Sequence, residues 1–409
     1  MRAVLAALLV SAAVTLSADL PGPTSDRYAA RYEDFVLVKR AAERLGAHST
    51  PAGERRGVAG TPRATEPGSG AEPRPVDARD VYAAARPGNL SPAVRGFPDR
   101  VYVPNSGGNT VDVIDPHTFT IVDHFKVGRQ PQHITPSYDL KTLWVLNDLG
   151  DSLTRIDPAT ARPLDTLNVK DPYNMYYTPD GRYAIVVAER THRLDFRDAQ
   201  TMKLIDSVPV PCRGVDHMDF SADGDYLIAS CEFSGDLVKM DVSTHKLLAT
   251  LKLPGGHAMP QDVRLAPDGS IFYVADMAGN GVFEIDGEAL KVIGFIATGK
   301  GAHGLYFSRD SKWLYVSNRN EGTVALIDVR TRTVATKWVI PGGGSPDMGG
   351  VSADGRVLWL SGRYHAEVYA FDTADGHLLA RIRVGKGPHG LCVYPQPGRY
   401  SLGHTGNLR

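Results

Sequence analysis

The chain has 409 residues, enough for two or three average domains or for one large repetitive domain. Its 45 Lys and Arg nearly balance 46 Asp and Glu, and the formal net charge of -1 disfavours nucleic acid as a partner. Hydrophobic residues make up 42% of the chain, so a sizeable core can form. Only 3 cysteines are present, which excludes a disulfide-built scaffold and a cysteine-rich zinc protein.

Residues 1–18 are typical of a secretory signal peptide. Met1 and Arg2 precede a small apolar run over residues 3–16, and the small residues Ser17 and Ala18 follow it. The run is shorter than the ~20 residues that a membrane span needs. We therefore expect a secreted or extracytoplasmic protein with no transmembrane span in its mature chain. An uncleaved N-terminal anchor is the alternative.

Two further segments precede the main domain. Residues 19–47 have the spacing of an amphipathic helix, with Tyr28, Tyr32 and Phe35 on one side and Ser25 as a potential N-cap. Residues 48–78 are rich in Pro, Gly, Ala, Arg and Glu and hold few apolar residues. This composition predicts a disordered linker. The folded domain then covers residues 79–409, including a C-terminal tail.

Similar segments recur from residue 101 onward. Residues 313–318 (WLYVSN) and 322–328 (GTVALID) parallel residues 101–105 (VYVPN) and 109–115 (NTVDVID). Asp-Gly pairs that favour tight turns recur in the units, at Asp180, Asp223, Asp268 and Asp354. The units begin near residues 101, 141, 182, 225, 270, 311 and 356. Their period of about 42 residues, with four short apolar runs in each, predicts an all-β, seven-bladed β-propeller of four-stranded antiparallel blades.

The phase of the repeat predicts how the ring closes. The chain enters on a second strand, at residues 101–105, and leaves on a first strand, at residues 390–394. The C-terminal strand should therefore join the N-terminal blade and remove the open sheet edges.

The repeat motif also resembles a known family. Residues 314–318 (LYVSN), followed by Gly322-Thr-Val and Ile327-Asp328, resemble the YVTN-repeat, YncE-like propellers, which are similar to haem d1 domains and lactonase-type propellers. The resemblance covers about residues 101–395 and implies the fold rather than one function. No Cys-x-x-Cys-His for covalent haem c is present.

Polar residues align where the first strands start and the second strands end, which should meet at one face of the ring, the top face. The first-strand positions are Gln132, His133, Tyr173, Asn174, Asp216, His217, Gln261, Asp262, His303, Asp347 and His389. The second-strand ends add Asn105, Asn147, Asp148, Glu189, Glu232, Asp276 and Asn318.

Imidazoles and carboxylates at a channel mouth suit two roles. They are ligands for a divalent transition metal, for which His133, His217, His303 and His389 are the candidates, and they serve in acid–base chemistry. The alternative is structural, because strand starts also need polar groups to hold channel water and loops.

Cys212 and Cys231 should both reach the top face of one blade. The sequence leaves three possibilities open: a disulfide, two half-buried free thiols, or thiolate ligation together with His217. Cys392 lies within an apolar run and should belong to the core.

Two functions fit these residues. The favoured hypothesis is an exported, monomeric propeller that binds a small ligand or a protein through the top face of its channel. The alternative is a metal- or cofactor-dependent enzyme or redox protein, lactonase-like or haem d1-like, that uses the ring of His and Asp residues. Neither the substrate nor the cofactor can be identified from the sequence.

Overall fold

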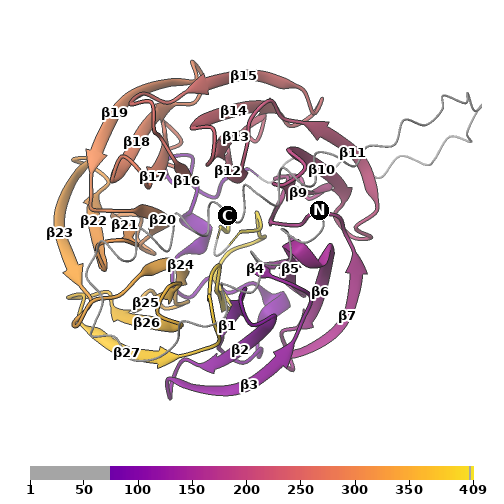
Figure 1. The fold of residues 1–409 in the computed structure, drawn as a ribbon, viewed down its shortest axis with the longest axis vertical. Coiled ribbons are helices and arrows are strands. Elements are labelled where there is room, and N and C mark those ends of the chain that lie inside the picture. Colours follow the sequence, from indigo (N-terminus) through magenta and orange to yellow (C-terminus); the bar gives the residue numbers. More distant parts are fainter. Residues whose placement is uncertain (1–73, 405–406) are drawn as a thin grey trace, which may run out of the picture. The chain divides into compact units, whose positions relative to one another are not determined.

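The computed structural model describes residues 74–404 and 407–409. The predicted signal peptide, the predicted helix and most of the predicted linker lie outside these residues. Within them, 28 strands form seven four-stranded antiparallel sheets arranged as blades around one axis (Figure 1). The predicted fold is therefore confirmed. No helix in the described part of the chain is both long enough and apolar enough to cross a bilayer.

Each blade has four positions, from the channel outward. The innermost strands are β28 (Cys392–Tyr394), β4 (Pro131–Pro136), β8 (Asn174–Tyr177), β12 (Val215–Phe220), β16 (Pro260–Leu265), β20 (Ala302–Phe307) and β24 (Pro346–Val351). The second strands are β1 (Arg100–Asn105), β5 (Leu143–Asn147), β9 (Tyr183–Ala188), β13 (Tyr226–Cys231), β17 (Phe272–Asp276), β21 (Trp313–Asn318) and β25 (Val357–Gly362).

The outer half of each blade is more exposed. The third strands are β2 (Thr110–Asp115), β6 (Ser152–Asp157), β10 (Arg193–Asp198), β14 (Asp236–Asp241), β18 (Gly281–Asp286), β22 (Thr323–Asp328) and β26 (Glu367–Asp372). The outermost strands are β3 (Thr120–Lys126), β7 (Arg162–Asn168), β11 (Leu204–Pro209), β15 (Leu247–Lys252), β19 (Lys291–Ala297), β23 (Thr333–Val339) and β27 (Leu378–Arg383). Over residues 74–404 and 407–409, three short 3-10 helices lie outside the sheets: η1 (Ala83–Ala85), η2 (Pro92–Val94) and η3 (Asp148–Gly150).

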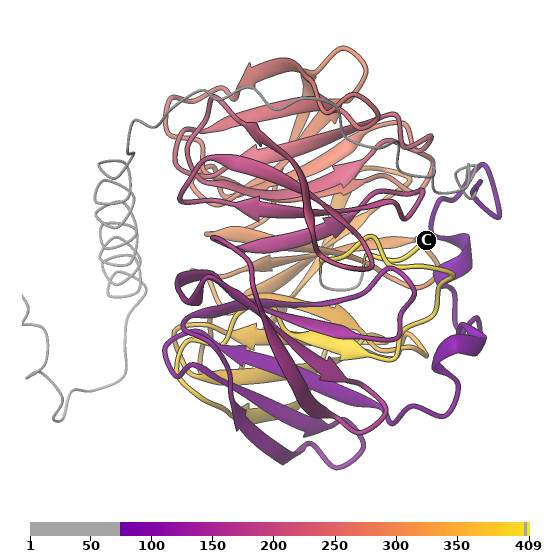
Figure 2. The same ribbon diagram turned by 90° about the vertical axis from the view of Figure 1, so that its right-hand side faces the viewer.

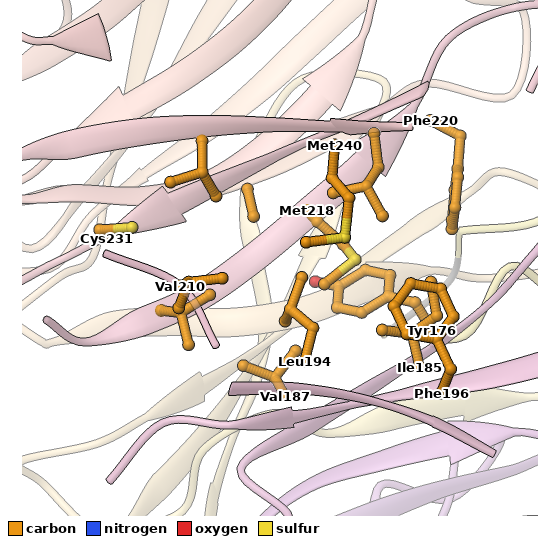
Figure 3. Packing of buried hydrophobic residues seen from close by; sticks show 14 of the residues in the cluster. Tyr176, Ile185, Val187, Leu194, Phe196, Val210, Met218, Phe220, Cys231 and Met240 are labelled. Atoms are coloured by element: carbon orange, nitrogen blue, oxygen red, sulfur yellow. The ribbon is translucent and has the colours of Figure 1, made fainter. Parts of the chain in front are cut away.

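The core lies between the blades. Each interface of neighbouring blades holds its own cluster of buried apolar side chains. Figure 3 shows the cluster between the β8–β11 and β12–β15 blades, in which Tyr176, Phe196 and Leu194 meet Met218 and Phe220. Because each sheet buries both faces only against its two neighbours, the ring folds as a unit.

The turns between first and second strands follow the sequence prediction. The carboxylate of Asp180 accepts hydrogen bonds from the Thr178 hydroxyl (2.6 Å) and the Arg182 backbone N–H (3.0 Å). Gly181 follows with a φ of 70°, a left-handed conformation that favours glycine. Asp223, Asp268 and Asp354 accept hydrogen bonds in the same way within their own turns, so the turn aspartates shape the hairpins.

The ring closes as predicted. β28 pairs with β1 in antiparallel register, with Arg100 opposite Tyr394, Val101 opposite Val393 and Tyr102 opposite Cys392. The sheet order β28-β1-β2-β3 thus joins the last strand to the first three (Figure 1). Cys392 is buried at this junction.

Deleting residues 388–409 should lower the melting temperature by at least roughly 10 °C, because the first blade loses its inner strand and its apolar cover. Deleting only residues 397–409 keeps β28 and should have a clearly smaller effect. Thermal unfolding followed by circular dichroism measures both. Equal melting temperatures for the two truncated chains would contradict the closing role of β28.

Candidate functional site

The channel axis is lined by the starts of the inner strands. His133 and His217 are fully buried, and His303 and His389 are each 2% exposed. β4 and β12 carry the first two side chains, β20 carries His303, and His389 precedes β28. The propeller geometry turns equivalent positions of different blades toward one axis, so these imidazoles meet although they lie far apart in the sequence.

The four predicted histidines form one cluster, and the structure adds a fifth. The ring centroids of His133 and His389 are 4.7 Å apart, and those of His133 and His217 are 5.3 Å apart. The ring of His404 lies 4.7 Å from that of His217 and 5.4 Å from that of His133. His303 contacts the cluster at 6.4 Å from His217 and 5.9 Å from His389.

The C-terminal tail brings His404 into the channel. The tail enters from the face opposite the mouth, where the Ser401 N–H donates to the Tyr138 carbonyl (3.1 Å). It continues antiparallel to β8, and the His404 N–H donates to the Met175 carbonyl (3.1 Å). The C-terminus consequently lies at the centre of the ring in Figure 1 and on the side of residues 74–99 in Figure 2.

Sequence reasoning missed His404 because it follows the last repeat, where no register assigns it a position. Its one sequence signal is a histidine flanked by glycines, Gly403 and Gly406, which is typical of a chain reversal.

Three side chains are placed as a metal-ligand set. One ligand atom from each of His217, Asp262 and His404 lies within 4.8 Å of the other two, and all three residues are buried. Nε2 of His404 is 3.4 Å from the Asp262 carboxylate. The Asn174 amide nitrogen lies 3.0 Å from Nδ1 of His217 and 3.2 Å from Nδ1 of His404, so this amide helps to fix both rings.

Asp262 is held as an ionised carboxylate. Its oxygens accept hydrogen bonds from the backbone N–H groups of Val263 (3.0 Å) and Leu305 (2.9 Å). Burial by itself would raise the pKa of Asp262. The Arg264 guanidinium, 3.7 Å away, and His404 outweigh burial and hold that pKa well below its usual range.

His133 lies beside this set with both ring nitrogens buried and without a hydrogen-bond partner among the described residues. Nε2 of His217 also has no hydrogen bond, although it lies 3.4 Å from the Asp216 carboxylate. Buried polar atoms are normally hydrogen-bonded. Imidazole nitrogens without hydrogen bonds at the centre of a histidine cluster are therefore the ligand atoms that a bound metal ion would use.

His303 and His389 are held by other partners. Both contact Asp347, His303 through Nδ1 at 3.2 Å and His389 through Nδ1 at 2.8 Å. Arg319 donates from Nε to the same carboxylate (2.9 Å) and also contacts His303. Nε2 of His389 lies 3.3 Å from the Tyr173 hydroxyl. Asp347 thus organises the second half of the cluster, on the side of blades β20–β23 and β24–β27.

The remaining predicted residues divide into two groups. Burial raises the pKa of Tyr173, and the nearby carboxylates of Asp216, Glu189 and Glu232 raise it further. Other residues serve local structure. Asp276 accepts three backbone N–H groups of its own loops, and the Gln261 amide donates to the Met259 carbonyl (3.1 Å).

The asparagines that end second strands also act locally. The amide groups of Asn105, Asn147 and Asn318 each donate to a threonine hydroxyl on the next strand, at Thr110, Thr154 and Thr323 respectively. Gln132 is fully buried, and within the part of the chain that the structure describes its amide atoms have no hydrogen-bond partner. The prediction of a ring of binding groups therefore selected some residues whose polar atoms are used within their own blade.

The cysteine pair forms a disulfide. Cys212 and Cys231 are joined with a Cα–Cα distance of 6.0 Å. The bond joins the loop before β12 to the end of β13. Cys212, in that loop, lies five residues before His217 in the sequence. Of the three possibilities left open by the sequence, the structure contains the first.

Comparison with known proteins identifies the family. The model of the YncE-like beta-propeller family matches residues 83–398, which is most of the chain. The chain belongs to the YncE-like beta-propeller family. No curated protein matched its sequence.

Solved structures share the fold of this YncE-like propeller at low identity. Dihydro-heme d1 dehydrogenase NirN is 17% identical, with a TM-score of 0.55 over 75% of this chain and 77% of its own. A putative 6-phosphogluconolactonase from Bacteroides fragilis is 17% identical, with a TM-score of 0.56 over 73% and 98%. Apo AztD from Citrobacter koseri is 14% identical, with a TM-score of 0.51 over 76% and 99%. These similarities establish architecture and leave the function to the site.

Burial in the channel favours the neutral form of four imidazoles of this YncE-like propeller. Burial lowers the pKa of His133, His217, His303 and His404, and neighbouring imidazoles add to the effect for His133 and His217. Arg319 lowers the pKa of His303 further. Neutral imidazole is the form that binds a metal ion, because the ligand nitrogen must carry a free electron pair.

This burial predicts a loss of stability in acid. In the metal-free protein the unfolded chain takes up protons as the pH falls through about 6.5, whereas the buried rings do not. The free energy of unfolding should therefore fall between pH 7 and pH 5, by up to about 1.4 kcal/mol per pH unit for each such histidine. His133→Gln should reduce this slope. Urea unfolding at several pH values, with chelator present, measures it.

The matched control for this experiment is His117→Gln, because the His117 side chain is 73% exposed. That variant should keep the wild-type slope. A slope that is unchanged in His133→Gln would contradict the neutral, buried state of His133.

Proposed function

We propose that this propeller is an extracytoplasmic binding protein whose ligand is a divalent transition-metal ion, held on the channel axis by His217, Asp262 and His404. The observation that carries the proposal is the convergence of one ligand atom from each of these residues within 4.8 Å, at a buried site. This proposal keeps the ligand-binding role favoured by the sequence and identifies the chemical class of the ligand.

The donor set supports an ion such as Zn²⁺ over Ca²⁺ or Mg²⁺. Imidazole nitrogen suits zinc, copper, iron and nickel, whereas calcium and magnesium prefer sites made of oxygen ligands. Asp262 is ionised and supplies the negative charge, and the neutral imidazoles supply nitrogen donors. Asn174 and Arg264 contact these ligands and keep them oriented.

The position of His133 favours a binding protein over an enzyme. Its nitrogens are free, and its ring lies 5.3 Å from that of His217 and 5.4 Å from that of His404. As a fourth ligand it would complete a closed tetrahedral set, which is typical of sites that hold zinc without catalysis. With only two histidines and one carboxylate the site would resemble catalytic sites that keep positions open for substrate.

The proposed location outside the cytoplasm rests on two features. The first 18 residues have the pattern of a secretory signal. The Cys212–Cys231 disulfide is of the kind that persists in oxidising compartments.

The wild-type protein, stripped with chelator and titrated with Zn²⁺, should bind one ion per chain and melt several degrees higher when loaded. His217→Gln should weaken zinc binding at least roughly 100-fold, because it removes a direct ligand. Competition with a chromophoric chelator measures the affinity. The Co²⁺-loaded protein should give the intense visible absorption of a tetrahedral site.

His303→Gln is the matched control within the same cluster, because the His303 ring is engaged by Asp347 and Arg319. This variant should keep its zinc affinity within about tenfold of that of the wild type. Tenfold is the smaller end of the loss in metal affinity that follows from mutating residues that contact a metal ligand without binding the metal. Zinc affinity that is equal in the wild type and in His217→Gln would overturn the proposed site. Loss of one ligand in His133→Ala, with Co²⁺ absorption changed, would support the closed set.

A further inference from the structure

We propose that the C-terminal arm, residues 399–404 and 407–409, is a removable part of the metal site that docks when the ion binds and withdraws when it leaves. The inference rests on the proposed function and adds its regulation. It follows from the origin of the ligands, because two come from inner strands of the ring and one comes from a segment beyond it.

The arm is independent of ring closure. β28 ends at Tyr394, where its pairing with β1 completes the first blade. The arm begins several residues later, so all seven sheets keep their strands when it leaves the channel. Withdrawal does remove Tyr400 and Leu402 from the apolar cluster between two blades and separates Arg409 from Asp219. His217 on β12 and Asp262 on β16 belong to the ring itself and stay in place.

The docked arm has defined contacts along its length. The Tyr177 N–H donates to the Leu402 carbonyl (3.0 Å), and the Leu402 N–H donates to the Asn407 carbonyl (2.8 Å), so the arm pairs with β8 and with itself. The Arg409 guanidinium donates to the Phe220 carbonyl (2.8 Å), and the Tyr400 ring stacks on that of Tyr138 at 5.1 Å. The arm therefore docks in one register, which fixes the height of His404 in the channel.

Binding of the ion and docking of the arm are coupled through His404. An ion bound by all three ligands favours the docked arm, and by linkage the docked arm raises the affinity for the ion by the same factor. Withdrawal leaves only His217 and Asp262 of the set in place. Docking and withdrawal of the arm thus change the number of ligands on the ion while the strands of every blade stay paired.

Gly403 allows docking to be blocked without removing a ligand. A Cβ atom at this position would lie 2.3 Å from the Met175 carbonyl oxygen and 2.6 Å from Cα of Tyr176, and its φ is +86°. Gly403→Ala should therefore keep the arm out of the channel while His404 is still present. Gly88→Ala is the matched control, because Gly88 has nearly the same φ, +85°, and no atom within 4 Å of the added Cβ.

The experiment uses the full chain with Zn²⁺ as the probe. Hydrogen exchange of the arm amides is compared in metal-free and zinc-loaded protein, and zinc affinity is measured by chelator competition for the wild type, Gly403→Ala, His404→Ala and Gly88→Ala. We expect zinc to slow exchange in the wild-type arm at least tenfold. Gly403→Ala and His404→Ala should each lose at least tenfold in affinity, and Gly88→Ala should match the wild type.

The outcomes separate this inference from the proposed function. If zinc binding requires His217 but Gly403→Ala and His404→Ala bind as the wild type does, the arm has no part in the site and the inference is wrong. Equal exchange of the arm with and without zinc would also overturn it. If the wild type binds no zinc at all, both the proposed function and this inference fail. Circular dichroism spectra and melting curves of each variant show whether the ring is intact.

Discussion

The structure depends on the need of each twisted sheet to bury both of its faces. A four-stranded blade cannot do this alone, and a closed ring of seven can, because each interface then holds one apolar cluster. Closure has a further consequence at the axis. Inner strands that start around one channel bring their first side chains together, so the residues at these positions meet whatever their separation in sequence. The chemistry of the protein is set by which residues occupy those seven starts.

The buried interior of the ring holds three pairs of opposite charges. Asp262 lies against Arg264, Asp347 against Arg319, and Asp219 against Arg409. Buried ion pairs contribute little net stability, because removing two charges from water costs about as much as their attraction returns. Apolar residues at these positions would satisfy packing at least as well. The first two pairs fix the carboxylates of Asp262 and Asp347 in one orientation beside buried imidazoles, and the third pair fixes the end of the C-terminal tail.

The sequence predicts the repeated part of the molecule well. The number of strands, the number of blades and the closing strand all follow from a sequence period that recurs seven times. The same repeat register places His133, His217, His303 and His389 at equivalent positions around one axis. It does not predict distances across the channel, so it could not separate Asp262, which faces His404, from Asp276, which caps a turn in its own blade. His404 was not predicted as a site residue because it belongs to no repeat. Such a residue is located only when the path of the tail is known.

The difference between the repeated blades and the residues that depart from the repeat explains how one fold supports different functions. Solved propellers that are 17% identical to this chain include dihydro-heme d1 dehydrogenase NirN and a putative 6-phosphogluconolactonase, so the fold alone does not specify a function. Function must therefore lie where the units differ from one another and where the chain departs from them. In this protein the units differ at the strand starts, and the chain departs from the repeat at its C-terminal arm. Both differences meet at the contact of His217 with His404, 4.7 Å between ring centroids. A site built in this way can change its ligand through a few axial residues while the interfaces between blades stay as they are.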